Sequence, residues 1–114
     1  IVSHHTAAET LALVDALPRD RFAPRVLENG SGPNELELLR AGFPGLHASE
    51  VNSGFAAGVN RLAAGCSGEW LLLLNPDLVP GAGLFETLAA RLPADPDVMV
   101  VGGVRHTPYL TATG

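Results

Sequence analysis

Short apolar runs alternate along this chain with longer stretches in which apolar residues recur every three or four positions. The short runs have the length of β-strands, and the periodic stretches have the spacing of amphipathic helices. The runs predict strands over 1–4, 22–27, 46–49, 70–74 and 98–101. The periodic stretches predict helices over 6–17, 33–39, 54–64 and 84–92. Strands that alternate with helices are typical of an α/β fold with a mainly parallel sheet.

For two of these elements, the pattern also predicts which side chains are buried. In the helix over 54–64, the apolar face that should contact the sheet consists of Phe55, Val59, Leu62 and Ala63. The run from Trp70 to Leu74 contains no polar residue and therefore predicts a strand that is buried on both faces.

Polar and glycine-rich segments follow three of the predicted strands, at 28–31, 50–58 and 75–80. In open parallel sheets, ligands bind outside the carboxyl ends of the strands. These three segments are therefore the candidates for a ligand site.

The second of these segments leads into the helix over 54–64. Asn52 or Ser53 is expected to cap this helix, and Gly54 and Gly58 allow another group to approach the backbone closely. Because a helix N-terminus presents unpaired amides, this segment suits an anion. The alternative is an ordinary helix cap, with Gly58 required for close contact between helix and sheet.

The other two segments each have two interpretations. Asp77 is a carboxylate at the end of a predicted strand and suits a hard divalent cation, but Asn75 and Asp77 also suit a simple Asx turn. Gly30 and Gly32 fit the first part of a dinucleotide-binding G-x-G-x-x-G motif, and Glu50 stands where a ribose-binding acid is expected. The third glycine position holds another residue, Glu35. Glu28, the first residue of this segment, also suits a solvated acid at a strand end.

Length and composition exclude several classes of function. The 114 residues are enough for one domain, and the aromatic fraction of 5% predicts an aliphatic core. Seven arginines against 12 acidic residues give a net charge of −5, and the arginines are scattered, which argues against nucleic-acid binding. The single Cys66 excludes an internal disulfide and a cysteine zinc cage. His4 and His5 are neighbours on a predicted strand and point to opposite faces, so a histidine metal site is not expected.

Four segments together resemble the N-terminal, nucleotide-sugar-binding half of an inverting family 2 glycosyltransferase of the rhamnosyltransferase type. They are Ile1-Val2-Ser3, Val26–Ser31, Asn52–Asn60 and Leu72–Asp77, in the order found in that family, and the resemblance runs from Ile1 to Gly103. It implies a three-layer, Rossmann-like GT-A fold that is incomplete at its C-terminus. Residues 1–114 would then be a single part of a larger catalytic domain.

The resemblance also implies a role for particular residues. Asp77 would hold Mg²⁺ or Mn²⁺ against the donor diphosphate, Asn75 would lie near the ribose, and Glu28 would contact the nucleobase. Ser3 would line the base pocket, and further nucleotide contacts would come from Asn52 and Gly54. The catalytic base is expected beyond residue 114, so that this chain binds the donor while turnover needs further residues.

The implied donor is a dTDP- or UDP-linked sugar, and the implied acceptor is a hydroxyl of a glycan or lipid-linked glycan in cell-wall or polysaccharide synthesis. The implied location is cytoplasmic, peripheral to the membrane. The chain departs from the family pattern at three places. His4-His5 replace a Tyr-Asn pair, Glu28 replaces an Asp, and Pro33 replaces an Asp.

Two alternative functions stay open. One is a nicotinamide-binding dehydrogenase fragment, and the other is a transferase-like module with a binding or scaffolding role and no catalysis.

Overall fold

Residues 1–92 are described by the computed structural model of this chain. Three short strands, β1 (Val2–Ser3), β2 (Leu27–Asn29) and β3 (His47–Ser49), form a parallel sheet in the order β1-β2-β3. In the register of this sheet, Leu27 lies opposite Val2 on one side and opposite His47 on the other.

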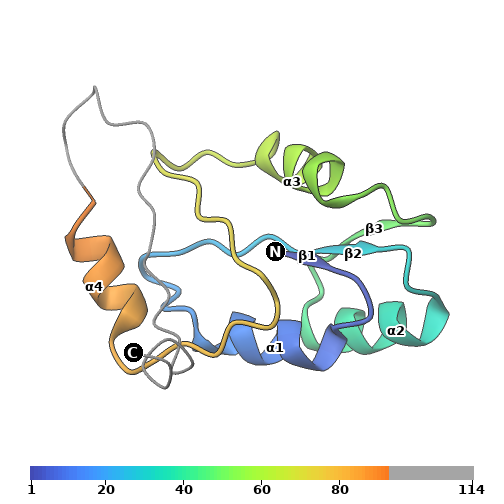
Figure 1. The fold of residues 1–114 in the computed structure, drawn as a ribbon, viewed down its shortest axis with the longest axis horizontal. Coiled ribbons are helices and arrows are strands. Elements are labelled where there is room, and N and C mark those ends of the chain that lie inside the picture. The colour runs from blue at the N-terminus through green and yellow to red at the C-terminus, as the bar shows by residue number, and fades with distance from the viewer. Residues whose placement is uncertain (93–114) are drawn as a thin grey trace, which may run out of the picture.

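Helices cover both faces of this sheet (Figure 1). They are α1 (Ala7–Ala16), α2 (Pro33–Gly42), α3 (Phe55–Ala63) and α4 (Leu84–Ala90). Helices α1 and α2 lie on one face and α3 lies on the other, while α4 stands near the C-terminal end of α1. This arrangement confirms the predicted α/β fold with a parallel sheet and is consistent with part of a Rossmann-like GT-A fold. None of the helices among residues 1–92 is long and apolar enough to cross a membrane.

The face of the sheet toward α3 is apolar. Val2 and Leu27 are register partners, so their side chains point the same way, and both are buried with Leu62 of α3. A Cβ added at Gly58 would lie 3.1 Å from Val2 Cγ1 and 3.2 Å from Leu27 Cδ2. This confirms that Gly58 permits close contact between helix and sheet.

The face toward α1 is polar where the strands end. Ser3 of β1 is buried, and its hydroxyl accepts a hydrogen bond of 3.0 Å from Thr10 Oγ1 of α1. The backbone amide of Ala7, in the first turn of α1, donates to Glu35 Oε2 of α2 at 2.9 Å. Helices α1 and α2 are thus joined at their N-terminal ends by a side chain that satisfies an otherwise unpaired helix amide.

A second apolar cluster fixes α4 against the C-terminal end of α1. Its buried members are Leu13, Leu17 and Phe85, and the ring of Phe85 lies edge-on to Phe22 with 5.7 Å between ring centroids. Edge-to-face arrangement at this separation is the favourable geometry for aromatic pairs.

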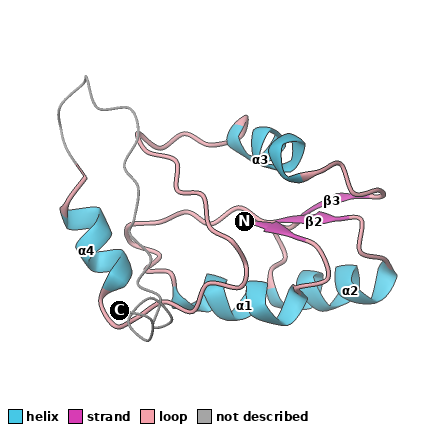
Figure 2. Cartoon of the chain, in the orientation of Figure 1, coloured by secondary structure: helices cyan, strands magenta, loops and turns pink. Residues whose placement is uncertain are grey.

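The predicted strand over 70–74 is wrong. This segment belongs to the long loop between α3 and α4, and within the described residues it pairs with no strand (Figure 2). A strand needs a neighbouring backbone to pair with, and within the described residues β1 pairs with β2 alone. The expectation of burial on both faces is wrong as well. Leu72 and Leu74 contact the second apolar cluster, whereas Leu71 is 50% exposed and Leu73 is 54% exposed.

The predicted strand over 22–27 is also mostly wrong, because β2 begins at Leu27 and continues to Asn29. Strand β1 reaches back no further than Val2, so residues 22–24 have no strand to pair with. Glu28 is consequently in the middle of β2 and only 2% exposed, which contradicts a solvated acid at a strand end. The predicted helices are confirmed with ends shifted by up to three residues, and the predicted strand over 98–101 lies outside the described residues.

Candidate functional site

The carboxyl ends of β1, β2 and β3 lie at the same edge of the sheet, where the N-terminal ends of α1, α2 and α3 also lie (Figure 1). The predicted residues Ser3, Glu28, Asn52 and Gly54 come from the strands and loops at this edge. We call this end of the sheet the carboxyl edge.

Asn29, the last residue of β2, organises the carboxyl edge. It is 1% exposed, and its Nδ2 donates to Asn52 Oδ1 at 3.0 Å and to the Gly54 carbonyl oxygen at 3.3 Å. Its Oδ1 accepts from the backbone amide of Ser53 at 3.1 Å and from Ser53 Oγ at 3.0 Å. One buried amide therefore holds the whole loop that leads into α3.

Asn52 does not cap α3 in the expected way. Gly54 is the N-cap residue, no side chain bonds to the first helical amides, and Asn52 Oδ1 accepts instead from the Gly54 amide at 2.9 Å. The expected cap by Asn52 or Ser53 is wrong because Asn29 engages both side chains. The amides of the first turn of α3 consequently have no side-chain acceptor in this structure.

Gly30 brings the two loops together. Its φ of 75° lies in the left-handed region, and a Cβ there would collide with the backbone of Val51 and Asn52. No other residue type fits this position, since only glycine combines that backbone angle with no side chain.

Glu28 holds the turn after β2. Its Oε1 accepts from the backbone amide of Ser31 at 2.8 Å. Ser31 Oγ in turn accepts from the backbone amide of His5 at 2.9 Å. His4 Nδ1 lies 3.0 Å from the Asn29 carbonyl oxygen, so the loops after β1 and β2 are tied together by several hydrogen bonds.

Asn75 and Asp77 are both exposed and lie on a separate segment. The backbone amide of Leu78 donates to the Asn75 carbonyl at 3.1 Å, which closes a turn over these residues. No side-chain hydrogen bond joins Asn75 or Asp77 to the loops of Asn29 in the described part of the chain. Residues 1–92 also contain no cluster of three or more His, Cys, Asp or Glu side chains placed to hold a metal ion.

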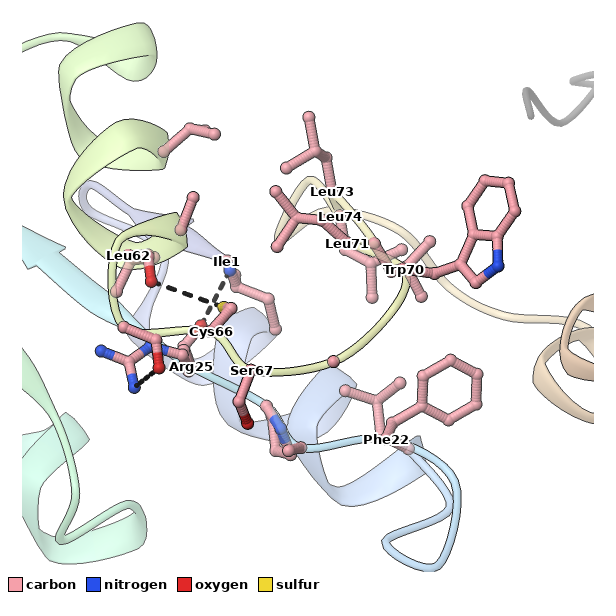
Figure 3. Close-up of a pocket in the computed structure, with 18 of the residues that line it drawn as sticks. Ile1, Phe22, Arg25, Leu62, Cys66, Ser67, Trp70, Leu71, Leu73 and Leu74 are labelled. Carbon is pink, nitrogen blue, oxygen red and sulfur yellow. Dashed lines mark hydrogen bonds between the residues drawn. The ribbon is translucent and has the colours of Figure 1, made fainter. Parts of the chain in front are cut away.

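A cavity of about 500 Å³ lies at the opposite, amino end of the strands (Figure 3). Ile1 and Leu62 stand on one side of it and the leucines of 71–74 on the other. At its rim, Arg25 donates to the Gly65 carbonyl at 3.2 Å and contacts His47 Nε2 at 3.1 Å. Burial here lowers the pKa of the Ile1 amino group below its ordinary value of 8.0, although the thiol of Cys66 acts in the opposite direction.

Asn29 is the site residue that the sequence interpretation left without a role. It lies in the segment that follows the predicted strand over 22–27, and its four side-chain hydrogen bonds are what distinguish it from an ordinary turn residue. An Asn-Gly pair one residue after an apolar run is the available signal, because asparagine bonds readily to nearby backbone groups. Glu35, considered as the third position of a dinucleotide motif, instead binds the amide of Ala7.

Comparison with protein-family models gives a match over most of this chain. The family model described as Glycosyl transferase family 2 matches residues 9–113. No curated protein and no solved structure matches the chain.

Proposed function

Because this chain belongs to glycosyl transferase family 2, we propose that its carboxyl edge binds a nucleoside-diphosphate sugar, whose sugar is transferred to an acceptor hydroxyl. The observation that carries the proposal is the Asn29 network. It holds Asn52 and Gly54 in one loop against the end of β2, the strand that also contains the buried Glu28. Family membership favours this function over the nicotinamide-binding alternative.

The proposed roles follow the position of each residue. Asn52 and Gly54 lie in a loop fixed against β2, and a fixed loop can contact a nucleotide without first becoming ordered. Glu28 shapes the turn through Ser31, and its carboxylate is the group we assign to the nucleobase. Ser3 is committed to Thr10, so we assign it to the wall of the base pocket rather than to a direct hydrogen bond.

Asp77 is the residue that we assign to Mg²⁺ or Mn²⁺, with Asn75 near the ribose. The exposed single carboxylate fits such an ion, because Mg²⁺ retains waters and is commonly bound through one or two carboxylates together with substrate phosphates. A bound divalent cation would stabilise negative charge on the departing diphosphate.

The chemical step that we propose is an inverting displacement. The bond between the anomeric carbon and the diphosphate oxygen breaks, and that oxygen keeps the electron pair. The acceptor oxygen forms the new bond from the opposite face, and its proton passes to a carboxylate base, which we expect beyond residue 114. Residues 1–92 would bind and orient the donor. We propose a UDP- or dTDP-linked donor, with rhamnose as the first sugar to test, and a glycan or lipid-linked acceptor at the cytoplasmic side of a membrane.

The test is a thermal-shift titration of the chain with UDP, dTDP, GDP and NADH, each with and without Mn²⁺. A ligand that binds only the folded state raises the unfolding midpoint, so binding is read directly. We expect a metal-dependent rise with a pyrimidine diphosphate, and loss of that rise in Asp77→Ala. The matched control is Asp15→Ala, which removes an exposed carboxylate from α1.

Three results would count against the proposal. A rise with NADH alone would support a dehydrogenase fragment. Metal-dependent nucleotide binding that persists in Asp77→Ala would refute the metal assignment. A cooperatively folding chain that binds none of the four compounds would favour a module without donor binding.

A further inference from the structure

The cavity at the amino end of the strands takes no part in the donor binding proposed above. Its volume of about 500 Å³ falls within the range of about 300–1,000 Å³ that is common for small-molecule sites. The residues that line it come from the loop before β2, from the C-terminal half of α3 and from the loop between α3 and α4. The cavity is therefore large enough for a ligand of its own.

The walls of this cavity are mostly hydrocarbon. Leu62 of α3 is buried on one side, and four consecutive leucines of the loop between α3 and α4 stand on the other (Figure 3). Leu71 and Leu73 are about half exposed there, although their neighbours pack into the second apolar cluster. Water needs two to four polar partners to be held in a cavity, and leucine side chains offer none. Hydrocarbon is consequently the chemistry that these walls accept best.

The charged side chains that line the cavity within residues 1–92 are both arginines, Arg21 and Arg25. No Asp or Glu of the described chain lines it, although the sequence holds 12 acidic residues against seven arginines. Arg25 donates to the Gly65 carbonyl and contacts His47 Nε2, and neither of these atoms carries a negative charge. Its Nε is buried without a partner in this part of the chain. The positive charge at the rim therefore has no carboxylate beside it in the lining.

We infer that this cavity binds a hydrocarbon chain that ends in an anionic head group, with the chain between the leucine walls and the head group at the arginine rim. An amphiphile of this kind satisfies both halves of the lining at once: its chain replaces water against the walls, and its charge is attracted by the two guanidinium groups. The inference goes beyond the proposed function and does not rest on it, because the cavity and the carboxyl edge lie at opposite ends of the strands.

The chain carries two natural reporters of this cavity. Cys66 is its single cysteine and Trp70 its single tryptophan, and both line the cavity. The Cys66 side chain is exposed, so iodoacetamide can reach its thiol, and a ligand in the cavity should slow the alkylation. Trp70 is half-buried, and its fluorescence should shift to shorter wavelength when hydrocarbon replaces water around the ring. An amphiphile that unfolds the chain would speed the alkylation instead, so slower alkylation reports binding.

The experiment titrates the chain with hexanoate, octanoate and decanoate, all below the concentrations at which they form micelles. We expect the dissociation constant to fall about fourfold for each added methylene that the cavity covers. Decyltrimethylammonium has the chain length of decanoate and the opposite charge, and it should bind about tenfold more weakly than decanoate. The net charge of −5 favours the cation over the anion, so a preference for the anion must come from the local arginines.

Two pairs of variants locate the binding. Arg21→Gln removes one charge of the rim and should weaken decanoate binding about threefold, whereas Arg19→Gln removes an exposed arginine of the same loop that does not line the cavity and should have no effect. Leu73→Ser places a hydroxyl in the wall and should weaken decanoate binding about fivefold. Its matched control is Leu38→Ser, because Leu38 is 49% exposed on α2 and lies outside the lining.

The inferred chemistry has two sources, a free fatty acid and the acyl chain of an anionic membrane lipid. Vesicles of phosphatidylcholine with and without phosphatidylglycerol distinguish them. Slower Cys66 alkylation with decanoate but with neither vesicle assigns the cavity to a free acid. Slower alkylation that also requires phosphatidylglycerol in the vesicle assigns it to the membrane lipid.

Several results would overturn the inference. Unchanged Cys66 alkylation and Trp70 fluorescence with every acid and both vesicles would show that the cavity takes no such chain. Equal affinity for hexanoate and decanoate, or equal losses in Leu73→Ser and Leu38→Ser, would place the binding elsewhere. Decyltrimethylammonium that binds as tightly as decanoate would refute the anionic head group. None of these results bears on nucleotide binding at the carboxyl edge, so the proposed function is tested separately.

Discussion

Replacing Asn29 should loosen the carboxyl edge more than any other single polar substitution in the described chain. Asn29→Ala removes four side-chain hydrogen bonds, to Asn52, Ser53 and Gly54. At about 1 kcal/mol each they would total roughly 4 kcal/mol. The partner residues are exposed, so water replaces part of each bond. We therefore expect the free energy of unfolding to fall by about 2–3 kcal/mol.

The measurement is urea unfolding followed by far-ultraviolet circular dichroism. The matched control is Asn34→Ala, because Asn34 is exposed on α2 and a surface change of this kind usually alters stability by no more than about 0.5 kcal/mol. Equal stability of Asn29→Ala and the control would refute the assignment of Asn29 as the residue that holds the α3 loop.

Asn29→Asp tests the same network with almost no change in shape. One carboxylate oxygen can still accept from Ser53, but the other would face Asn52 Oδ1 and the Gly54 carbonyl, which also only accept. Burial and these oxygens should raise the pKa of the new carboxyl group. The folded state would then bind a proton more tightly than the unfolded chain, so the free energy of unfolding should rise as the pH falls. Stability of this variant that does not increase on acidification would contradict the donor role of Nδ2.

Two further predictions concern the backbone. Gly30→Ala should lower the free energy of unfolding by at least about 2 kcal/mol and weaken nucleotide binding, because the added Cβ collides with the loop after β3. Gly32→Ala has open space around its Cβ and should cost about 1 kcal/mol for its positive φ. Equal losses of stability for the two variants in urea unfolding would contradict the collision. The pKa of the Ile1 amino group is lowered in the folded state, so the unfolded chain binds a proton at this group more tightly. The free energy of unfolding should therefore rise with pH up to about 8. Acetylation of the amino group should abolish this rise.

The fold was predictable wherever one short segment determines an element. The periodic apolar positions located all four described helices, and Pro33 begins α2 as the first-turn preference of proline requires. Strand ends were less predictable, because a strand exists only where a neighbouring backbone pairs with it. Residues 22–24 and 70–74 have apolar runs but no such neighbour in the described chain.

The face of α3 shows the same limit. Leu62 is buried against Val2 and Leu27 as the periodic pattern predicts, whereas Phe55, assigned to the same face, is 54% exposed. Phe55 begins the helix at the carboxyl edge, beyond the end of the three-strand sheet. Helical spacing defines a face, but the length of the sheet beneath that face decides which of its residues are covered.

The candidate site was predictable as a place and not as a set of contacts. The rule that ligands bind at the carboxyl ends of parallel strands located the segments after β1, β2 and β3. The hydrogen bonds between these segments join residues more than 20 positions apart, such as Asn29 with Ser53 and His5 with Ser31. Such pairings depend on the register of the sheet, which the polar segments themselves do not encode.

The electrostatic character of the site illustrates why composition alone misleads about ligands. A net charge of −5 suggests that the chain repels anions, yet charges beyond about 8 Å are largely screened at physiological ionic strength. What an anionic donor meets is local: the first turns of α1, α2 and α3 with their partial positive charge, the acids of the strand loops, and the His4-His5 pair. The net charge of the whole chain therefore does not decide which ligands this edge accepts; the groups within a few ångströms of the ligand do.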